Sequence, residues 1–370
     1  MRSKFGAALC ACAFVAGMSP AAVLPKIELP SDSPVAVLGS DYSESSESVR
    51  GGATLLDLHA ALSFRNSSQR RIRGITLIVT AQDVTPGGKG SVTVTSLDVA
   101  PSETFPIRID LRLLRPLAGG GSIPVLVGLD GVLFDDLQFY GPDKLNSRRT
   151  LTLCEFEARR DRQYFKSLMA SGGQERLQKE ILASIARQAD RPNVDVQMVR
   201  AGRATNFEPE KQVQFAFLDQ PDSPIQPLNG MAKLAGNEAR SPRVDIRNRS
   251  DRQVRYLEIG WILHDRQGRE FLAGAVPAQI SLAPGQKGLI QSETALRFPA
   301  RPNQPLSIDS MSGYISNVEF ADGTMWIPNR AELSDPRFQK IVGPSAEEQR
   351  LVQLYHKRGI KGLVEELKKF

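Results

Sequence analysis

The fold is decided by the stretch Leu56-Asp57-Leu58-His59-Ala60-Ala61-Leu62-Ser63-Phe64, which leads into Arg65-Asn66-Ser67-Ser68. Every second residue from Leu56 to Phe64 is apolar, and the positions between them are mostly polar. Successive side chains of a β-strand point to opposite faces, so this period predicts a strand with one buried face. The same period recurs in residues 105–111, 123–129 and 257–263. The chain is therefore expected to be mainly β.

The strand end at Asn66 has a second copy further along the chain. Phe64-Arg65-Asn66-Ser67-Ser68 recurs 182 residues later as Ile246-Arg247-Asn248-Arg249-Ser250. Both copies match a glycosylation sequon, but their recurrence at equivalent turns favours a capping role for the Asn side chain. Short loop insertions make the shift of a duplicated domain grow slowly, and this pattern predicts an internal repeat. Further pairs continue the match at shifts of 183 to 186: Ala100 and Ala283, Phe134 and Phe320, Asp136 and Asp322, Tyr140 and Trp326.

Each copy resembles the immunoglobulin-like and fibronectin-type-III-like β-sandwich modules of bacterial secreted proteins. The resemblance rests on Arg-Asn-x-Ser at a strand end, a long strand, and then Leu282-Ala283-Pro284-Gly285 before another strand. The first copy departs from this pattern, with Ala100-Pro101-Ser102 in place of Ala-Pro-Gly. The resemblance implies two tandem immunoglobulin-like domains of antiparallel sheets, with adhesion, spacing or binding roles and no catalytic residues.

A short helical segment is predicted after each copy. Apolar stripes at helical spacing begin at Leu177 and at Ile360, and breaks at Gly172-Gly173 and Gly359 predict helical hairpins. Each stripe is expected to pack on its own sandwich, with binding of a partner as the alternative. Two residue pairs fit capping boxes at helix starts, Ser345 with Glu348 and Ser171 with Gln174. The helices are also expected to belong to the duplication, because Tyr164-Phe165-Lys166 resembles Tyr355-His356-Lys357.

The first 21 residues are expected to be a signal peptide. Arg2 and Lys4 precede an apolar stretch that is too short to span a bilayer and ends at a small-residue cleavage site. The exported chain is placed in the periplasm or the extracellular space. A lipid anchor at Cys12 is disfavoured because Cys12 lies too close to the start, and only Cys154 remains in the mature chain, which excludes an internal disulfide.

Charge gives no sign of a nucleic-acid partner. Without Arg2 and Lys4, 45 basic side chains face 41 acidic ones, a net charge of +4. The basic residues are scattered among acidic ones, as in Arg159-Arg160-Asp161-Arg162, so they form no contiguous stripe. No later apolar run is long enough for a transmembrane helix.

No catalytic, cofactor or metal site is predicted. His59, His264 and His356 are the only histidines, and they show no metal-ligand spacing and no serine elbow beside them. Asp136 and Asp322 occupy equivalent positions before short strands, which favours a hairpin-turn role over paired carboxylate catalysis. Sugars and proteins both bind exposed aromatic rings, and the best candidates for such a surface are Tyr140 and Trp326.

These observations predict a secreted, non-enzymatic binding, adhesion or spacer protein of the cell envelope, whose partner is a protein or a cell-surface polymer. The alternatives are a secreted carboxylate-dependent hydrolase and a sensor or assembly partner engaged through the C-terminal helix. The expected organisation is a signal peptide (1–21), a linker (22–52), a first sandwich (53–154), a helical segment (155–190), a strand-containing linker and entry to the second unit (191–240), a second sandwich (241–330) and a C-terminal helical segment (331–370).

Overall fold

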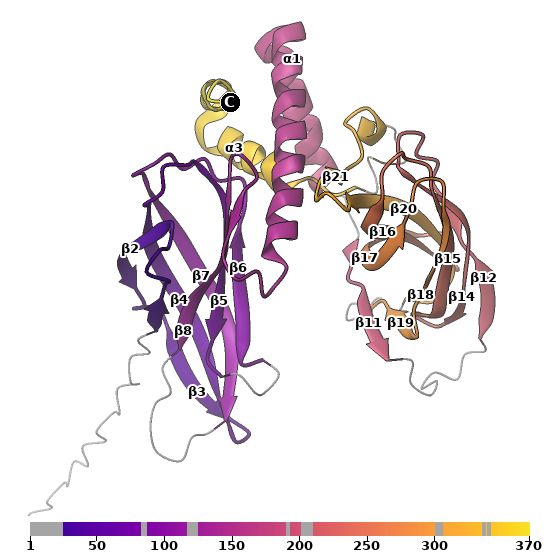
Figure 1. Cartoon of the computed structure of the whole chain (residues 1–370), viewed down its shortest axis with the longest axis horizontal. Coiled ribbons are helices and arrows are strands. Elements are labelled where there is room, and N and C mark those ends of the chain that lie inside the picture. Colours follow the sequence, from indigo (N-terminus) through magenta and orange to yellow (C-terminus); the bar gives the residue numbers. More distant parts are fainter. Residues whose placement is uncertain are drawn as a thin grey trace, which may run out of the picture. The chain divides into compact units, whose positions relative to one another are not determined.

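The computed structural model describes residues 25–82, 87–116, 125–189, 193–200, 210–299, 306–334, 338 and 342–370. The expected leader and its cysteines lie outside these residues. The chain divides into two compact units, Met1–Leu151 and Thr152–Phe370, and each contains two β-sheets (Figure 1). The mainly-β prediction is confirmed. No helix in the described ranges is long and apolar enough to cross a membrane.

The first sandwich encloses its core between two sheets. The alternation in the quoted stretch holds at every position, since Leu56, Leu58 and Phe64 are fully buried on one face of β4. One sheet has the order β1 (Lys26–Glu28), β8 (Leu126–Phe134), β5 (Ile72–Thr80), β6 (Lys89–Val94), with β9 (Phe139–Tyr140) on β8. In the other, β4 (Ala53–Asn66) pairs with β2 (Val35–Asp41), β3 (Ser46–Arg50) and β7 (Thr104–Pro116).

The second sandwich repeats this plan and adds short edge strands. Its first sheet has the order β10 (Asn193–Val194), β17 (Glu270–Leu282), β16 (Val254–Asp265), β20 (Ile308–Phe320), β13 (Ala216–Phe217), with β21 (Met325–Trp326) on β20. Its second has the order β11 (Gln197–Arg200), β19 (Thr294–Arg297), β15 (Glu238–Asn248), β14 (Ile225–Ala235), β12 (Lys211–Gln214), with β18 (Lys287–Gln291) on β15. The expectation of purely antiparallel sheets is wrong at β1, β10 and β13, each of which pairs in parallel.

The duplication is visible in the contacts of two buried asparagines. The side-chain amide of Asn66 donates to Arg70 O at 2.7 Å and Val99 O at 3.1 Å, and its Oδ1 accepts from Ser68 N at 3.0 Å. Asn248 makes the equivalent bonds to Arg252 O, Leu282 O and Ser250 N at 2.7, 3.0 and 3.0 Å. Both side chains are fully buried, which confirms the turn role and leaves no accessible amide nitrogen for a glycan.

Ser102 in the first copy stands where the second copy has Gly285, but the backbone conformation is the same at both positions. Ser102 has φ 64° and Gly285 has φ 74°, and their N–H groups donate to Asn66 O and Asn248 O at 2.9 Å each. A serine in this left-handed region is strained, whereas glycine adopts it readily. The turn is therefore the same in both copies, and the first copy is less well suited to it.

Two predicted boundaries need correction, and the predicted strands of a third segment are present. Residues 26–50, expected to be a linker, form β1, β2 and β3, because their backbone groups complete the edges of both sheets. The sandwich does not extend to Cys154, since helix α1 (Ser147–Ala189) begins at Ser147. The strands expected in the linker and entry at 191–240 are confirmed as β10 to β14. Short strands such as β1 and β3 carry no alternation long enough to be recognised.

The two helical segments pack against each other. α1 and α3 (Ala346–Leu367) share one apolar cluster (magenta and yellow in Figure 1), so the expectation that each stripe packs on its own sandwich is wrong. Both predicted breaks are confirmed, with φ 66° at Gly173 and φ 65° at Gly359. Gly173 and Gly359 are 186 residues apart, and buried apolar residues of the two helices match at the same shift. These pairs replace the predicted match of Tyr164 with Tyr355: Phe165 and Leu351, Leu177 and Leu363, Ile181 and Leu367.

Of the two predicted capping boxes, one is half formed. Ser345 is the N-cap of α3, and its Oγ accepts from Glu348 N at 3.0 Å. The Glu348 carboxylate accepts from Ser184 and Arg330 instead. Ser171 caps no helix start, because it lies within α1, where its hydroxyl donates to Leu168 O at 3.3 Å. The pattern rule failed there because the preceding helix continues up to the break at Gly173.

Candidate functional site

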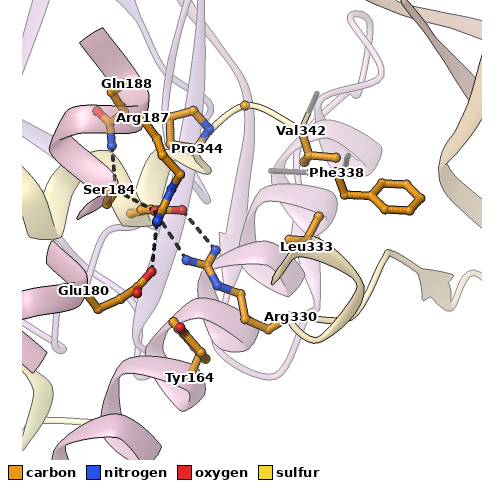
Figure 2. Close-up of a pocket in the computed structure, with 12 residues that line it drawn as sticks. Tyr164, Glu180, Ser184, Arg187, Gln188, Arg330, Leu333, Phe338, Val342 and Pro344 are labelled. Carbon is orange, nitrogen blue, oxygen red and sulfur yellow. Dashed lines mark hydrogen bonds and ion pairs between the residues drawn. The ribbon is translucent and has the colours of Figure 1, made fainter. Parts of the chain in front are cut away.

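Several paired charged side chains lie around a small polar pocket between α1 and the N-terminus of α3 (Figure 2). The carboxylate of Glu348 accepts from Ser184 Oγ at 2.6 Å and from Arg330 at 3.0 Å, and Arg187 approaches it to 3.7 Å. The Arg330 guanidinium also lies over the Tyr164 ring, 4.5 Å from its centre. Burial opposes ionisation, but the Arg330 and Ser184 hydrogen bonds hold the pKa of Glu348 below its usual value.

Asp161 connects this pocket to the helix cap. Its side chain is fully buried and accepts from Arg160 at 2.9 Å, Ser345 Oγ at 2.5 Å and Arg330 at 3.3 Å. Ser345 thus serves both the backbone of α3 and the carboxylate on α1. The arrangement fixes the start of α3 on α1 through bonds that all carry at least one charged group, which are stronger than neutral ones.

A second ionic group holds the same helices further along. Arg162 donates to Glu155 at 2.9 Å and approaches Glu347 at 3.7 Å. Glu347, equivalent to Asp161 by the shift of 186, pairs with Arg350 at 2.7 Å, and Arg350 also pairs with Glu366 at 2.6 Å. Buried carboxylates at corresponding positions of both helical segments therefore have guanidinium partners. Removing one member would leave an uncompensated buried charge.

The ionic contacts and hydrogen bonds of Glu348 and Asp161 with Arg330, Ser184 and Ser345, called the charged clamp below, join α1 to the start of α3. The polar pocket has a volume of about 30 Å³, which is the space of one water molecule and far below that of a substrate site. Its acidic groups already have arginine or hydroxyl partners. The arrangement can hold two helices together, but it leaves no room for a substrate beside a reactive group.

Two groups near the clamp have raised pKa values. Burial raises the pKa of Glu157 to about 7, with Asp161 and Glu258 adding to the effect against Arg160. Burial, together with Glu157 and Glu155, raises the pKa of the Cys154 thiol to about 12. A thiol with such a pKa is protonated at neutral pH and is a poor nucleophile. Cys154 is half-buried on α1, so the expectation of a fully packed core residue holds only in part.

The candidate binding aromatics, Tyr140 and Trp326, occupy the equivalent short strands β9 and β21. Both rings are half-buried and pack against the cores of their own sandwiches. The Tyr140 hydroxyl donates to Asp32 at 2.7 Å, and burial with this carboxylate raises its pKa to about 12. They are therefore less exposed than expected, because each short strand lies along the edge of its core.

The turn role predicted for the duplicated aspartates is confirmed. Asp136 accepts from Gln138 N at 3.0 Å and Asp322 from Thr324 N at 3.0 Å. Arg252 pairs with Asp322, and this pair with the Thr324 N–H lowers the pKa of Asp322 to about 2. Each aspartate thus stabilises a hairpin turn in its own unit.

The histidines lie on separate elements. His59 lies on β4 and pairs with Asp110 of β7 at 2.8 Å, and His264 lies on β16 and pairs with Glu270 of β17 at 3.2 Å. His356 lies on α3. Asp265, the neighbour of His264, accepts from the Arg269 backbone and side chain within its own turn. No group of three or more metal-ligating side chains occurs in the described part of the chain.

Sequence reasoning missed the charged clamp. Asp161 and Arg330 are 169 residues apart, and each reads locally as part of a solvated charge pattern. A usable signal was the shift of 186, which aligns Asp161 with Glu347 among buried apolar positions. Asp130 was also missed: it is fully buried and accepts from Lys144 N, Leu145 N and Ser147 Oγ at the start of α1.

Comparisons with known proteins give no family assignment. No protein family and no curated protein matches the sequence. Among solved structures, red sea bream transglutaminase is 8% identical over 78% of this chain and 29% of that one, with a TM-score of 0.14. A structure described as pT26-6p is 8% identical over 90% of this chain and 72% of that one, with a TM-score of 0.17. At such scores neither likeness supports an argument about fold or function.

Proposed function

We propose that this chain is an exported, non-enzymatic protein of the cell envelope, in which two immunoglobulin-like sandwiches bind a protein or a cell-surface polymer or act as a spacer. The observation that carries the proposal is the duplicated turn end of each sandwich. There the polar side chains that could serve a hydrolase, Asp136 and Asp322, instead hold equivalent hairpin turns.

The helical segment supports the spacer aspect. α1 follows the first sandwich directly, and α3 is fixed to it by apolar packing and by the Asp161 and Glu348 ion pairs. Helices braced in this way form a stiff element within the second unit, as suits a spacer. The third hypothesis, a partner engaged through α3, would require an exposed stripe, whereas Leu351, Leu363 and Leu367 are fully buried.

The test is crosslinked capture from the native envelope fraction, using the chain from residue 22 and mass spectrometry of the retained material. We expect one reproducible partner whose recovery falls at least about tenfold in Trp326→Ala or Tyr140→Ala, as for central aromatic contacts. Tyr140→Phe is the matched control, because it keeps the ring and removes only the bond to Asp32. Recovery that is unchanged in both alanine variants would refute this aromatic surface.

A further inference from the structure

The second sandwich contains a cavity of about 270 Å³ between its two sheets. Its lining residues belong to β16 and β17 of one sheet and to β11, β15, β18 and β19 of the other, with Ser292 between the last two strands. Figure 1 labels these strands. Protein interiors are close-packed and contain few voids larger than a water molecule. This one is open to solvent on one side and reaches the buried residues Val244, Ile259 and Trp261 of the core.

The cause can be read by comparison with the first sandwich. There Ile109, on the unbroken strand β7, is fully buried opposite Ala60. At the equivalent place the second sandwich has Ser292, whose N–H donates to Pro242 O at 3.3 Å. Ser292 falls in the gap between β18 and β19, so a large apolar side chain and a continuous strand are both lost. Ser292 and Pro242 line the cavity.

The facing strand has lost volume at the same level. Val94 of β6 lies beside Ile75, and Ala278 of β17 lies beside the equivalent Leu257. Ala278 also lines the cavity. Two smaller side chains on opposite walls therefore leave space at positions where the first copy has Ile109 and Val94 packed into its core.

The lining has the chemistry of a ligand site. Among the described residues around the cavity none is charged, and most are apolar. Trp261 is 2% exposed and belongs to the lining, yet its Nε1–H has no acceptor within the described part of the chain. A buried donor without an acceptor is costly, so such groups call for a partner. Met198 and Leu289, at 55% and 47% exposure, are lining residues that give the cavity an apolar mouth.

We propose that the second sandwich binds a small, neutral, mainly apolar molecule with one hydrogen-bond acceptor, which the Trp261 indole N–H contacts. A cavity of about 150 Å³ holds benzene, so this one has room for roughly eleven heavy atoms. That size fits a bicyclic ring or a short acyl chain with a carbonyl or ether oxygen. The site is separate from the proposed macromolecular surface and does not depend on it.

The probes are α-tetralone, which carries a carbonyl on a bicyclic ring, and tetralin, the same skeleton without the oxygen. In a Trp326→Phe background Trp261 is the only tryptophan, and its fluorescence reports occupancy directly. We expect saturable binding of α-tetralone, about tenfold tighter than tetralin, as one hydrogen bond to a buried donor would give. A charged analogue of the same size, 1-aminotetralin, has an ammonium group in place of the carbonyl and is expected to bind at least about tenfold more weakly than α-tetralone.

Two filling variants locate the site. Ser292→Ile restores the side chain of the first copy, and Ala278→Val does the same on the facing wall; each is expected to weaken α-tetralone binding at least about tenfold by occupying the space. Calorimetry with Trp261→Phe is expected to abolish the preference for α-tetralone over tetralin. If one filling variant fails to fold by circular dichroism, the other decides. No binding to folded protein, or binding unchanged in the filled variant, would overturn the proposal, and equal affinity for both probes in the Trp326→Phe protein would overturn the role of Trp261.

Discussion

Replacing Asn248 with alanine should unfold the second sandwich at much lower denaturant than the wild type requires. The change removes the donors to Arg252 O and Leu282 O and the acceptor for Ser250 N, all around a fully buried side chain. Leaving a buried polar group unpaired costs about 1–3 kcal/mol, and part of this turn borders solvent. A net loss of about 3–5 kcal/mol is therefore expected, which is a large part of the stability of an ordinary domain.

The assay is urea denaturation of the full chain, followed by tryptophan fluorescence. Both tryptophans, Trp261 and Trp326, lie in the second unit, so the signal reports that unit alone. Asn66→Ala is the matched change in the first unit, where hydrogen exchange of peptides from β4 and β8 gives the readout. Asp251→Ala, at an exposed position in the second turn, is the control and should change stability by less than about 0.5 kcal/mol. A loss below about 1 kcal/mol in both asparagine variants would refute the claim that these side chains lock the duplicated turns.

Four further outcomes follow from the structure. Ser102→Gly should stabilise the first unit by about 1 kcal/mol, since it relieves a left-handed serine, and Gly285→Ser should destabilise the second by a similar amount; opposite signs in hydrogen exchange and fluorescence melts would contradict the backbone assignment. Arg330→Met should cost about 3–5 kcal/mol by leaving buried carboxylates uncompensated, measured by denaturation monitored by circular dichroism. The raised pKa of Glu157, about 7, means that its stabilising proton is bound below pH 4.5 and lost as the pH rises through 7. Glu157→Gln should therefore be more stable than the wild type by about 1–3 kcal/mol at pH 8 and equal to it near pH 4.5. A stability difference that stays constant across that range would count against this assignment. Cys154 in the chain from residue 22 should react with a thiol reagent at pH 8 far more slowly in the folded protein than in urea, because burial raises its pKa to about 12; equal labelling rates in the two states would disagree.

Features that depend on neighbouring residues could be predicted from the sequence. The strand at Leu56 to Phe64 was evident from its alternation, and the turn role of Asn66 from its recurrence at Asn248. The breaks at Gly173 and Gly359 followed from the low helical preference of glycine. In each case the local chemistry and the tertiary structure favour the same conformation.

Features that depend on long-range pairing could not be predicted in this way. The short strands before residue 52 are defined by the neighbours they pair with, such as Lys26 beside Leu126. The pairing of the two helical segments requires knowing that stripes far apart in the chain face one another. The cavity arises from small differences between the copies, such as Ile109 against Ser292, which become meaningful only when the strands are aligned in space.

The absence of enzymatic activity is tested by a turnover screen of the purified, folded chain from residue 22 against panels of glycans and peptides, with Asp136→Asn and Asp322→Asn as paired variants. No turnover above background is expected for any of the three proteins, because both aspartates hold hairpin turns. Turnover by the wild type that is lost in either variant, while circular dichroism shows the fold intact, would contradict the binding and spacer function and assign the chain to the hydrolases.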